Sequence, residues 1–202
     1  MTRSINDLNE EISRWAFEIL FKSNLHWRIA FTNPTAGPWK TIKATDSDGN
    51  VGEVYRFPLE ETRPDIILYN DELEAVLIIE AKDSLNKLVA GDQADKSVEV
   101  VERLSNILSG LGNNPFWNRR AHYSTYMGIL WGSTDVLANN EAVTAVFDTY
   151  YSIAQTKQSV NKDFIIGVES LYKGGKIECF FHHKVYSPGK EDRCTSVEQS
   201  LK

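Results

Sequence analysis

Hydrophobic positions near the N-terminus follow a helical period. In residues 7–22, DLNEEISRWAFEILFK, the apolar side chains recur at spacings of three and four: Leu8, Ile12, Trp15 and Ile19. This spacing predicts an amphipathic helix. Glu11 and Glu18 fall together on one flank of the apolar stripe, so both carboxylates could overlook whatever the helix packs against. Charged residues beside such a stripe are also the ordinary pattern of a solvated helix flank.

Two β-hairpins are predicted after this helix. TIKAT and GEVYRF flank DSDGN, whose Asp, Gly and Asn residues favour a turn. In residues 63–82, RPDIILYNDELEAVLIIEAK, the polar NDEL separates the strand-like runs DIILY and EAVLIIEAK, which predicts a second antiparallel hairpin. Alternation along the last run places Glu80 and Lys82 on one face of the strand and Ala81 on the other.

The rest of the chain mixes helical and strand patterns. It predicts, in order, a helix over residues 92–108 capped by Asp92, a strand over 124–132, a helix over 138–156, and a hairpin of 163–172 with 176–186 around KGGK. We expect one α/β domain over residues 1–186, followed by a polar, mobile tail over residues 187–202.

Composition agrees with a folded, soluble protein, because 42% of the 202 residues are hydrophobic and 25% are charged. The first residues lack the basic-then-apolar order of a signal peptide, and no apolar run approaches the ~20 residues that cross a bilayer. We therefore expect a cytoplasmic protein with no membrane partner. Cys179 and Cys194 form no C-x-x-C pair, so neither a disulfide framework nor a thiolate metal site is expected.

The net charge of −6 argues against nucleic-acid binding by the whole surface, which usually needs a basic footprint. The charge is uneven, however. Residues 46–83 hold eleven acids and three bases, a net −8, so the rest of the chain carries +2. A basic surface outside that segment is therefore permitted, because the electric field depends on where the charges lie.

Asp65, Glu80 and Lys82 are charged residues at the ends of apolar strands. Burying a charge is costly unless the charge is paired or binds a metal. A salt bridge at a strand end would satisfy this condition, and so would a hard cation shared by Asp65 and Glu80 with Lys82 beside it. Mg²⁺ suits such a site, because it takes oxygen ligands, needs only one or two carboxylates, and keeps room for water and a substrate phosphate. Carboxylate sites of this kind serve phosphodiester hydrolysis in two-metal nucleases.

A known family carries a similar motif. Pro64-Asp65, fourteen intervening residues and Glu80-Ala81-Lys82 at the end of an apolar strand resemble the signature of the PD-(D/E)xK nuclease superfamily. That superfamily includes type II restriction endonucleases, Holliday-junction resolvases and repair nucleases. The order helix, hairpin, helix, strand over residues 7–131 is also similar to its core. The resemblance implies an α/β fold of restriction-endonuclease-like architecture, with a mixed central β-sheet flanked by helices.

The resemblance also implies roles for four residues of the motif. Asp65 and Glu80 would be metal ligands, and the Ala81 carbonyl would face the same ion. Lys82 would orient or help to deprotonate the attacking water, or stabilise charge on the phosphate.

Two further groups of residues enter through the resemblance. Many members of the superfamily add a glutamate from the first helix, for which Glu11 is the first candidate and Glu18 the second. Some exonuclease branches carry a Gln followed four residues later by a Tyr. This chain has Gln93 but Ser97, so that branch is not indicated and Gln93 is a lesser candidate.

The function implied is that of a Mg²⁺-dependent endonuclease acting on double-stranded DNA. About 70 residues follow the region of resemblance, which favours a type II restriction endonuclease or its catalytic subunit, working as a homodimer or with a second nuclease or specificity subunit. Three alternatives stay open: a structure-selective repair or recombination nuclease similar to a resolvase, a non-catalytic DNA-binding subunit that retains the fold, and a protein-binding module.

One polar loop could take part in reading DNA. Five residues of GNNPFWNRRAH combine amide, aromatic and guanidinium groups that suit base edges or stacking: Asn113, Asn114, Trp117, Arg119 and Arg120. An ordinary solvated loop has the same composition.

Overall fold

The computed structural model describes residues 14, 17, 26–33, 40–186 and 195–197. Arg14 and Phe17 are helical. Glu11 and Glu18, the glutamates expected on the first helix, lie outside the described residues. Within the described part, no helix is long and apolar enough to cross a membrane.

The described chain forms nine strands and two long helices, with five strands before the first of these helices and three after the second. The strands are β1 (Arg28–Thr32), β2 (Thr41–Thr45), β3 (Val51–Arg56), β4 (Ile66–Asn70), β5 (Ala75–Lys82), β6 (Ser124–Thr134), β7 (Phe164–Lys173), β8 (Lys176–Val185) and β9 (Thr195–Val197). The long helices are α2 (Gln93–Ser109) and α3 (Asn140–Ala154), and two short 3₁₀ turns cover Leu85–Leu88 and Asn118–Arg120.

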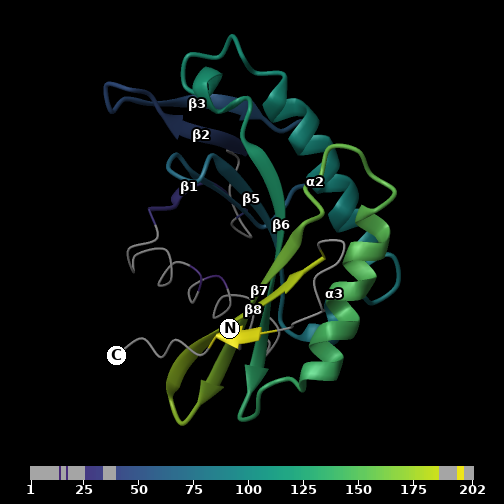
Figure 1. Ribbon diagram of the computed structural model, residues 1–202. Coiled ribbons are helices and arrows are strands. Elements are labelled where there is room, and N and C mark those ends of the chain that lie inside the picture. The colour runs from purple at the N-terminus through teal and green to yellow at the C-terminus, as the bar shows by residue number, and fades with distance from the viewer. Residues whose placement is uncertain (1–13, 15–16, 18–25, 34–39, 187–194, 198–202) are drawn as a thin grey trace.

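The main sheet has seven strands in the order β1-β4-β5-β6-β7-β8-β9, and β2 pairs with β3 in a separate two-stranded sheet. The pairs β5 with β6 and β6 with β7 are parallel, and all other pairs are antiparallel. The predicted α/β class with a mixed central sheet is therefore confirmed. Figure 1 shows α2 and α3 along one side of this sheet, with the β2–β3 hairpin at one end.

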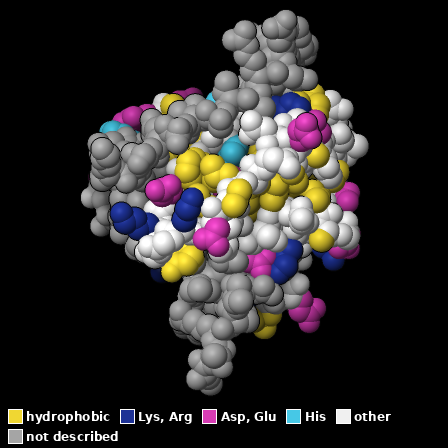
Figure 2. Space-filling model, turned by 90° about the horizontal axis from the view of Figure 1, so that it is seen from below, with side chains coloured by type: hydrophobic (Ala, Val, Ile, Leu, Met, Phe, Trp, Pro, Cys, Tyr) yellow, Lys and Arg dark blue, Asp and Glu magenta, His cyan; other side chains and the backbone are white. Residues whose placement is uncertain are grey.

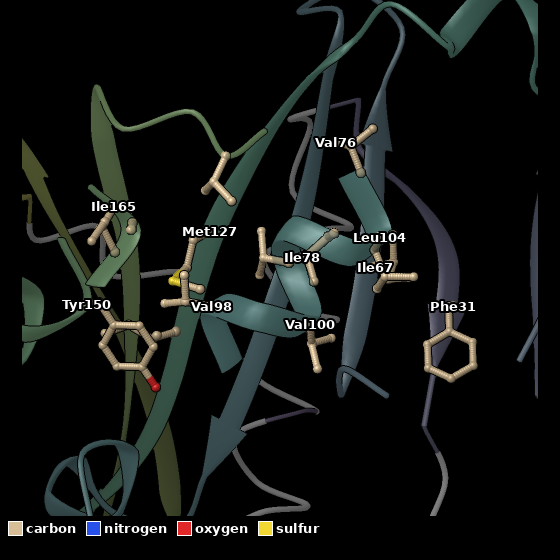
Figure 3. Packing of buried hydrophobic residues seen from close by; sticks show 14 of the residues in the cluster. Phe31, Ile67, Val76, Ile78, Val98, Val100, Leu104, Met127, Tyr150 and Ile165 are labelled. Carbon is tan, nitrogen blue, oxygen red and sulfur yellow. The ribbon is translucent and has the colours of Figure 1, made fainter. Parts of the chain in front are cut away.

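The sheet packs on both faces. On one face, strand residues such as Ile67 and Ile78 meet Val98 and Leu104 of α2 and Tyr150 of α3 in a single cluster (Figure 3). On the opposite face, Phe17 belongs to a second cluster with strand residues that alternate with the first set: Ile66, Leu68, Leu77, Ile79, Ala81 and Leu130. Helices α2 and α3 therefore cover one face, and the helical residue Phe17 packs on the other.

The β4–β5 hairpin has the predicted positions. Its antiparallel register runs from Asn70 opposite Ala75 to Ile66 opposite Ile79. The Asn70 side chain closes the turn, since its Oδ1 accepts the N–H groups of Glu72 and Leu73, both at 2.9 Å. The expected alternation along β5 is confirmed, because consecutive residues enter opposite core clusters.

The structure tests two predictions for residues at chain turns, the Asp92 cap of α2 and the KGGK hairpin. Asp92 occupies the position before α2, but its side chain makes no capping hydrogen bond and instead lies 2.9 Å from Lys96 Nζ. The capping role was wrong because its backbone, with φ −100° and ψ 17°, is not extended, as a side-chain cap requires. The KGGK hairpin is confirmed: Gly174 and Gly175 have φ of 57° and 78°, which a two-residue type I′ turn demands.

The C-terminal segment expected to be a polar tail contributes one short strand. Residues 195–197 form β9, which pairs antiparallel with β8 between Phe181 and His183. The other residues from 187 onward lie outside the described residues.

A buried carboxylate ties the C-terminal half of the sheet together. Glu169 of β7 is fully buried, and its Oε1 accepts hydrogen bonds from Ser133 Oγ at 2.5 Å and Ala138 N at 2.7 Å. Its Oε2 lies 3.1 Å from His182 Nε2. Burial alone would raise the pKa of Glu169, but the hydrogen bonds from His182, Ser133 and Ala138 outweigh it, so the pKa lies below its ordinary value.

We expect Glu169→Gln to lower the free energy of unfolding by about 1–3 kcal/mol near neutral pH, because an amide turns a donor toward Ser133 or Ala138. Because folding depresses the pKa of Glu169, its stabilisation is present above the ordinary value of 4.5 and is lost as the pH falls through the lower, folded value. Urea unfolding at neutral pH and below pH ~4.5 tests this. The deficit should shrink in acid, whereas Glu99→Gln, at an exposed position, should change stability little at either pH.

Candidate active site

Asp65 lies where the chain enters β4, beside the C-terminal end of β5. Its backbone N–H donates to the Ile79 carbonyl at 3.1 Å, and its Oδ2 accepts the Ala81 N–H at 2.8 Å. Ile79 and Ala81 are the neighbours of Glu80 in β5. The structure therefore places Asp65 against the two neighbours of Glu80 in β5, although fourteen residues separate Asp65 from Glu80 in the sequence.

Glu80 and Lys82 point to the same side of β5. Lys82 Nζ is paired with Glu80 Oε1. The same oxygen accepts a hydrogen bond from Gln93 Nε2, at the first residue of α2, at 2.9 Å. The Glu80 side chain is only 14% exposed, so these donors stabilise a carboxylate that has lost most of its water. Gln93, the lesser candidate from the sequence, is thus in direct contact with the motif.

Ser97 contacts Gln93, and Tyr150 lies near Ser97 and Glu80. Ser97 Oγ lies 3.3 Å from Gln93 Nε2 and donates to the Gln93 carbonyl at 2.8 Å. Tyr150 of α3 is buried and donates its hydroxyl to the Leu88 carbonyl at 3.0 Å. Burial raises the pKa of Tyr150, and the negative charge of Glu80 raises it further while Ser97 lowers it. The Tyr150 hydroxyl is therefore a neutral group at the back of the site.

Arg14 was not predicted to belong to the site. Its Nη2 lies 2.7 Å from Asp65 Oδ1, and its Nη1 donates to the Asn33 carbonyl at 2.5 Å. Both carboxylate oxygens of Asp65 are thus engaged, one by Arg14 and one by Ala81. The sequence offers no local signal for this contact, since 51 positions separate the two residues.

The loop that leads into Asp65 is held by two arginines. Arg63 Nη2 donates to the carbonyls of Pro58 and Leu59 at 3.1 and 2.9 Å. Arg103 of α2 pairs with Glu61 at 2.7 Å. These contacts fix the approach of the chain, so the position of Asp65 does not depend on its own side-chain contacts alone.

The described oxygen donors suit a cation that keeps much of its water. Asp65 and Glu80 supply two carboxylates on adjacent chain segments. Among the residues that the structure describes, no group of three or more His, Cys, Asp and Glu side chains is arranged to hold a metal. A cage such as structural zinc requires is therefore not seen in this part of the chain, whereas Mg²⁺ needs only one or two carboxylates. Ala81 contacts Asp65 through its N–H, so a role for its carbonyl remains a prediction.

Cations balance the carboxylates around this site. Asp65 is paired with Arg14, and Glu80 with Lys82. Just beyond β5, Asp83 is paired with Lys87 at 2.5 Å. These ion pairs show how the acidic segment recognised in the sequence is accommodated in the fold.

The polar loop after α2 is built mainly for structure. Arg120 is buried and forms a bidentate pair with Asp71, at 2.6 Å from Nε to Oδ1 and 2.7 Å from Nη2 to Oδ2. Its guanidinium also stacks 4.5 Å from the centre of the Tyr69 ring. Trp117 is fully buried. These two residues are therefore not placed to read base edges. Their burial was missed because the polar composition of the loop is typical of a solvated loop.

Tyr123 belongs to the same cluster. Its hydroxyl lies 3.0 Å from Asp71 Oδ1. Burial and the neighbouring Asp71 raise the pKa of Tyr123 to about 12. Burial tends to raise the pKa of Asp71, but Arg120 and Tyr123 outweigh this and lower it.

Arg120→Ala should lower the free energy of unfolding by about 3–5 kcal/mol, because it removes a fully buried side chain together with its bidentate pair to Asp71. Arg119→Ala removes the same charge from the adjacent position, where the side chain is 46% exposed and 3.5 Å from Asp71. We expect that variant to stay within about 0.5 kcal/mol of the parent. Chemical unfolding of both variants tests the comparison. Equal effects would contradict a structural role specific to Arg120.

Acidic and basic side chains of the described residues are interspersed on the face shown in Figure 2, around a group of hydrophobic side chains. That face does not present a field of one sign. Among the described residues on this face, the basic surface that the charge distribution permits is therefore not found.

Comparisons with known proteins do not assign the chain to a family. Scans of the sequence against protein-family models and against curated proteins return no match. The case for a function therefore rests on the residues of the motif and the fold that positions them.

Proposed function

We propose that this protein is a Mg²⁺-dependent endonuclease of restriction-endonuclease-like fold that hydrolyses phosphodiester bonds in double-stranded DNA. The observation that carries the proposal is the meeting of Asp65, Glu80 and Lys82 at the end of β5. Two carboxylates and an ammonium at the end of one hairpin, next to parallel strands covered by α2, support the proposal, because the superfamily motif combines the same groups.

Each residue has a role that its contacts support. Asp65 and Glu80 would hold the cation, which when bound lowers the pKa of its water and stabilises charge on the phosphate. Lys82 lies beside Glu80, where its ammonium could orient the attacking water or contact a phosphate oxygen. Gln93 positions Glu80 through a 2.9 Å hydrogen bond.

Within this class, a type II restriction endonuclease or its catalytic subunit is the activity that we favour. Strand β7, which pairs with β6, lies beyond the region of resemblance together with α3 and β8. These elements give the chain more structure than the motif hairpin and its helix alone require. This added structure could carry a homodimer contact or a contact to a specificity subunit. A structure-selective repair nuclease would use the same catalytic residues and would prefer branched DNA.

Glu80→Ala should reduce DNA cleavage at least about 100-fold, because loss of a ligand removes several kcal/mol of charge stabilisation. The parent and the variant are incubated with plasmid, phage and branched DNA in Mg²⁺ or in chelator. Glu99→Ala removes a carboxylate of the same kind from an exposed position of α2 and should cleave as the parent does. Discrete Mg²⁺-dependent bands support the restriction activity, nicked or branched-substrate products support the repair activity, and cleavage by Glu80→Ala at the parental rate contradicts the proposal.

Gln93→Ala should reduce cleavage by about 10- to 100-fold, as expected when a group that orients a metal ligand is lost. Because the Gln93 amide touches Glu80 and Ser97, Gln93→Glu places a second carboxylate beside Glu80 and should be at least as damaging. Rates measured at saturating Mg²⁺ separate a loss of cation affinity from a loss of geometry. Unchanged rates for Gln93→Ala would contradict its positioning role.

A non-catalytic DNA-binding subunit is the second candidate. It is favoured by the pairing of Asp65 with Arg14 and of Glu80 with Lys82, which satisfies both carboxylates without a cation. Saturable DNA binding that neither Mg²⁺ nor chelator alters, with no cleavage, would favour this candidate over the nuclease.

A further inference from the structure

Arg14 joins three separate parts of the chain at Asp65. Its two terminal nitrogens contact the Asp65 carboxylate and the Asn33 carbonyl. Asn33 in turn donates its N–H to the Asp65 carbonyl at 2.8 Å. Arg14, Asn33 and Asp65 thus form a closed ring of contacts between a helical residue, the end of β1 and the start of β4.

The Arg14 contact falls on the oxygen that a cation would use. Oδ2 of Asp65 accepts a hydrogen bond from the Ala81 N–H, a backbone group held in strand β5. Oδ1 is paired with the guanidinium at 2.7 Å. A cation that approaches Oδ1 therefore meets the positive charge of Arg14 at close range.

The Coulomb energy of such an approach is unfavourable. Among the described residues, Arg14 and Lys82 each add one positive charge beside one carboxylate, so the four groups sum to zero. The positive charge of Arg14 opposes a divalent ion at Asp65, so the ion binds more favourably when that charge moves away. The Arg14 side chain is 20% exposed, so part of it already contacts solvent.

We propose that Arg14 is a positioning residue that holds Asp65 in the metal-free protein and competes with the divalent cation for its Oδ1. Cation binding displaces the guanidinium from Asp65, and the displaced group is then available to a phosphate oxygen, which a guanidinium binds well. Arg14 therefore sets the cation affinity of the site. This inference rests on the proposed function, since it takes Asp65 to be a metal ligand.

The test measures the affinity of the full chain for Mn²⁺, either by calorimetry or from the spin-resonance signal of the free ion. Arg14→Gln should bind Mn²⁺ at least about tenfold more tightly than the parent, because a unit charge near the ion is removed. Arg14→Lys keeps that charge and should stay within about threefold of the parent. Arg28→Gln makes the same charge change at an exposed position of β1 and should have no effect in ~0.1 M salt.

A purely structural role for Arg14 gives a different result. Arg14→Gln would then bind Mn²⁺ equally or more weakly, which overturns the proposal, as does an equal gain for Arg14→Lys. Circular dichroism establishes folding, and Arg14→Met, which keeps the apolar stem, replaces Arg14→Gln if the latter does not fold. The variant Asp65→Asn distinguishes a failure of the proposed metal site from a failure of the role given to Arg14. If neither the parent nor Arg14→Gln shows Mn²⁺ binding that Asp65→Asn abolishes, the proposed metal site fails. If such binding exists and Arg14→Gln is no tighter, only the role of Arg14 fails.

Discussion

The antiparallel pairing of β4 with β5 is the constraint on which the candidate site depends. Its register, ending at Ile66 opposite Ile79, fixes where the chain enters β4 and therefore where Asp65 meets Ala81. A shift by one residue would exchange the two core clusters, because Ile78 packs under α2 while Ile79 packs with Phe17. The packing of both faces thus sets the register, and the register brings a carboxylate to the side of Glu80.

The surroundings of the motif make each carboxylate tolerable in the absence of a cation. Arg14 neutralises Asp65, and Lys82 with Gln93 stabilises Glu80. Two charged groups with less than a fifth of their side-chain surface exposed would otherwise be costly to bury. The same pairing gives the proposed nuclease a metal-free state in which Arg14 and Lys82 are paired with the carboxylates that would bind the cation. The negative charge of a bound phosphodiester would offset part of the positive charge that a divalent ion adds to these pairs.

Periodicity in the sequence predicted much of this fold. The β4–β5 hairpin, the strand that became β6 and the KGGK hairpin lie where alternation and turn residues place them, because local backbone preferences decide these features. Long-range contacts carry no such signal. The pairing of Arg14 with Asp65, the burial of Arg120 against Asp71 and the Glu169–His182 contact depend on which segments the fold brings together. Gln93 stood out in the sequence only as part of an incomplete motif, and its contact with Glu80 follows from where α2 begins.

The central claim is that Asp65 and Glu80 share one divalent cation. Crystals grown with Mn²⁺ and measured at the manganese absorption edge test it directly, since the anomalous signal locates the ion without assumptions about activity. The account predicts a peak at about 2.0–2.3 Å from a carboxylate oxygen of each residue, with Arg14 moved from Asp65 Oδ1. Crystals that show Arg14 and Lys82 still paired with Asp65 and Glu80, and no ion between the carboxylates at saturating Mn²⁺, would contradict it.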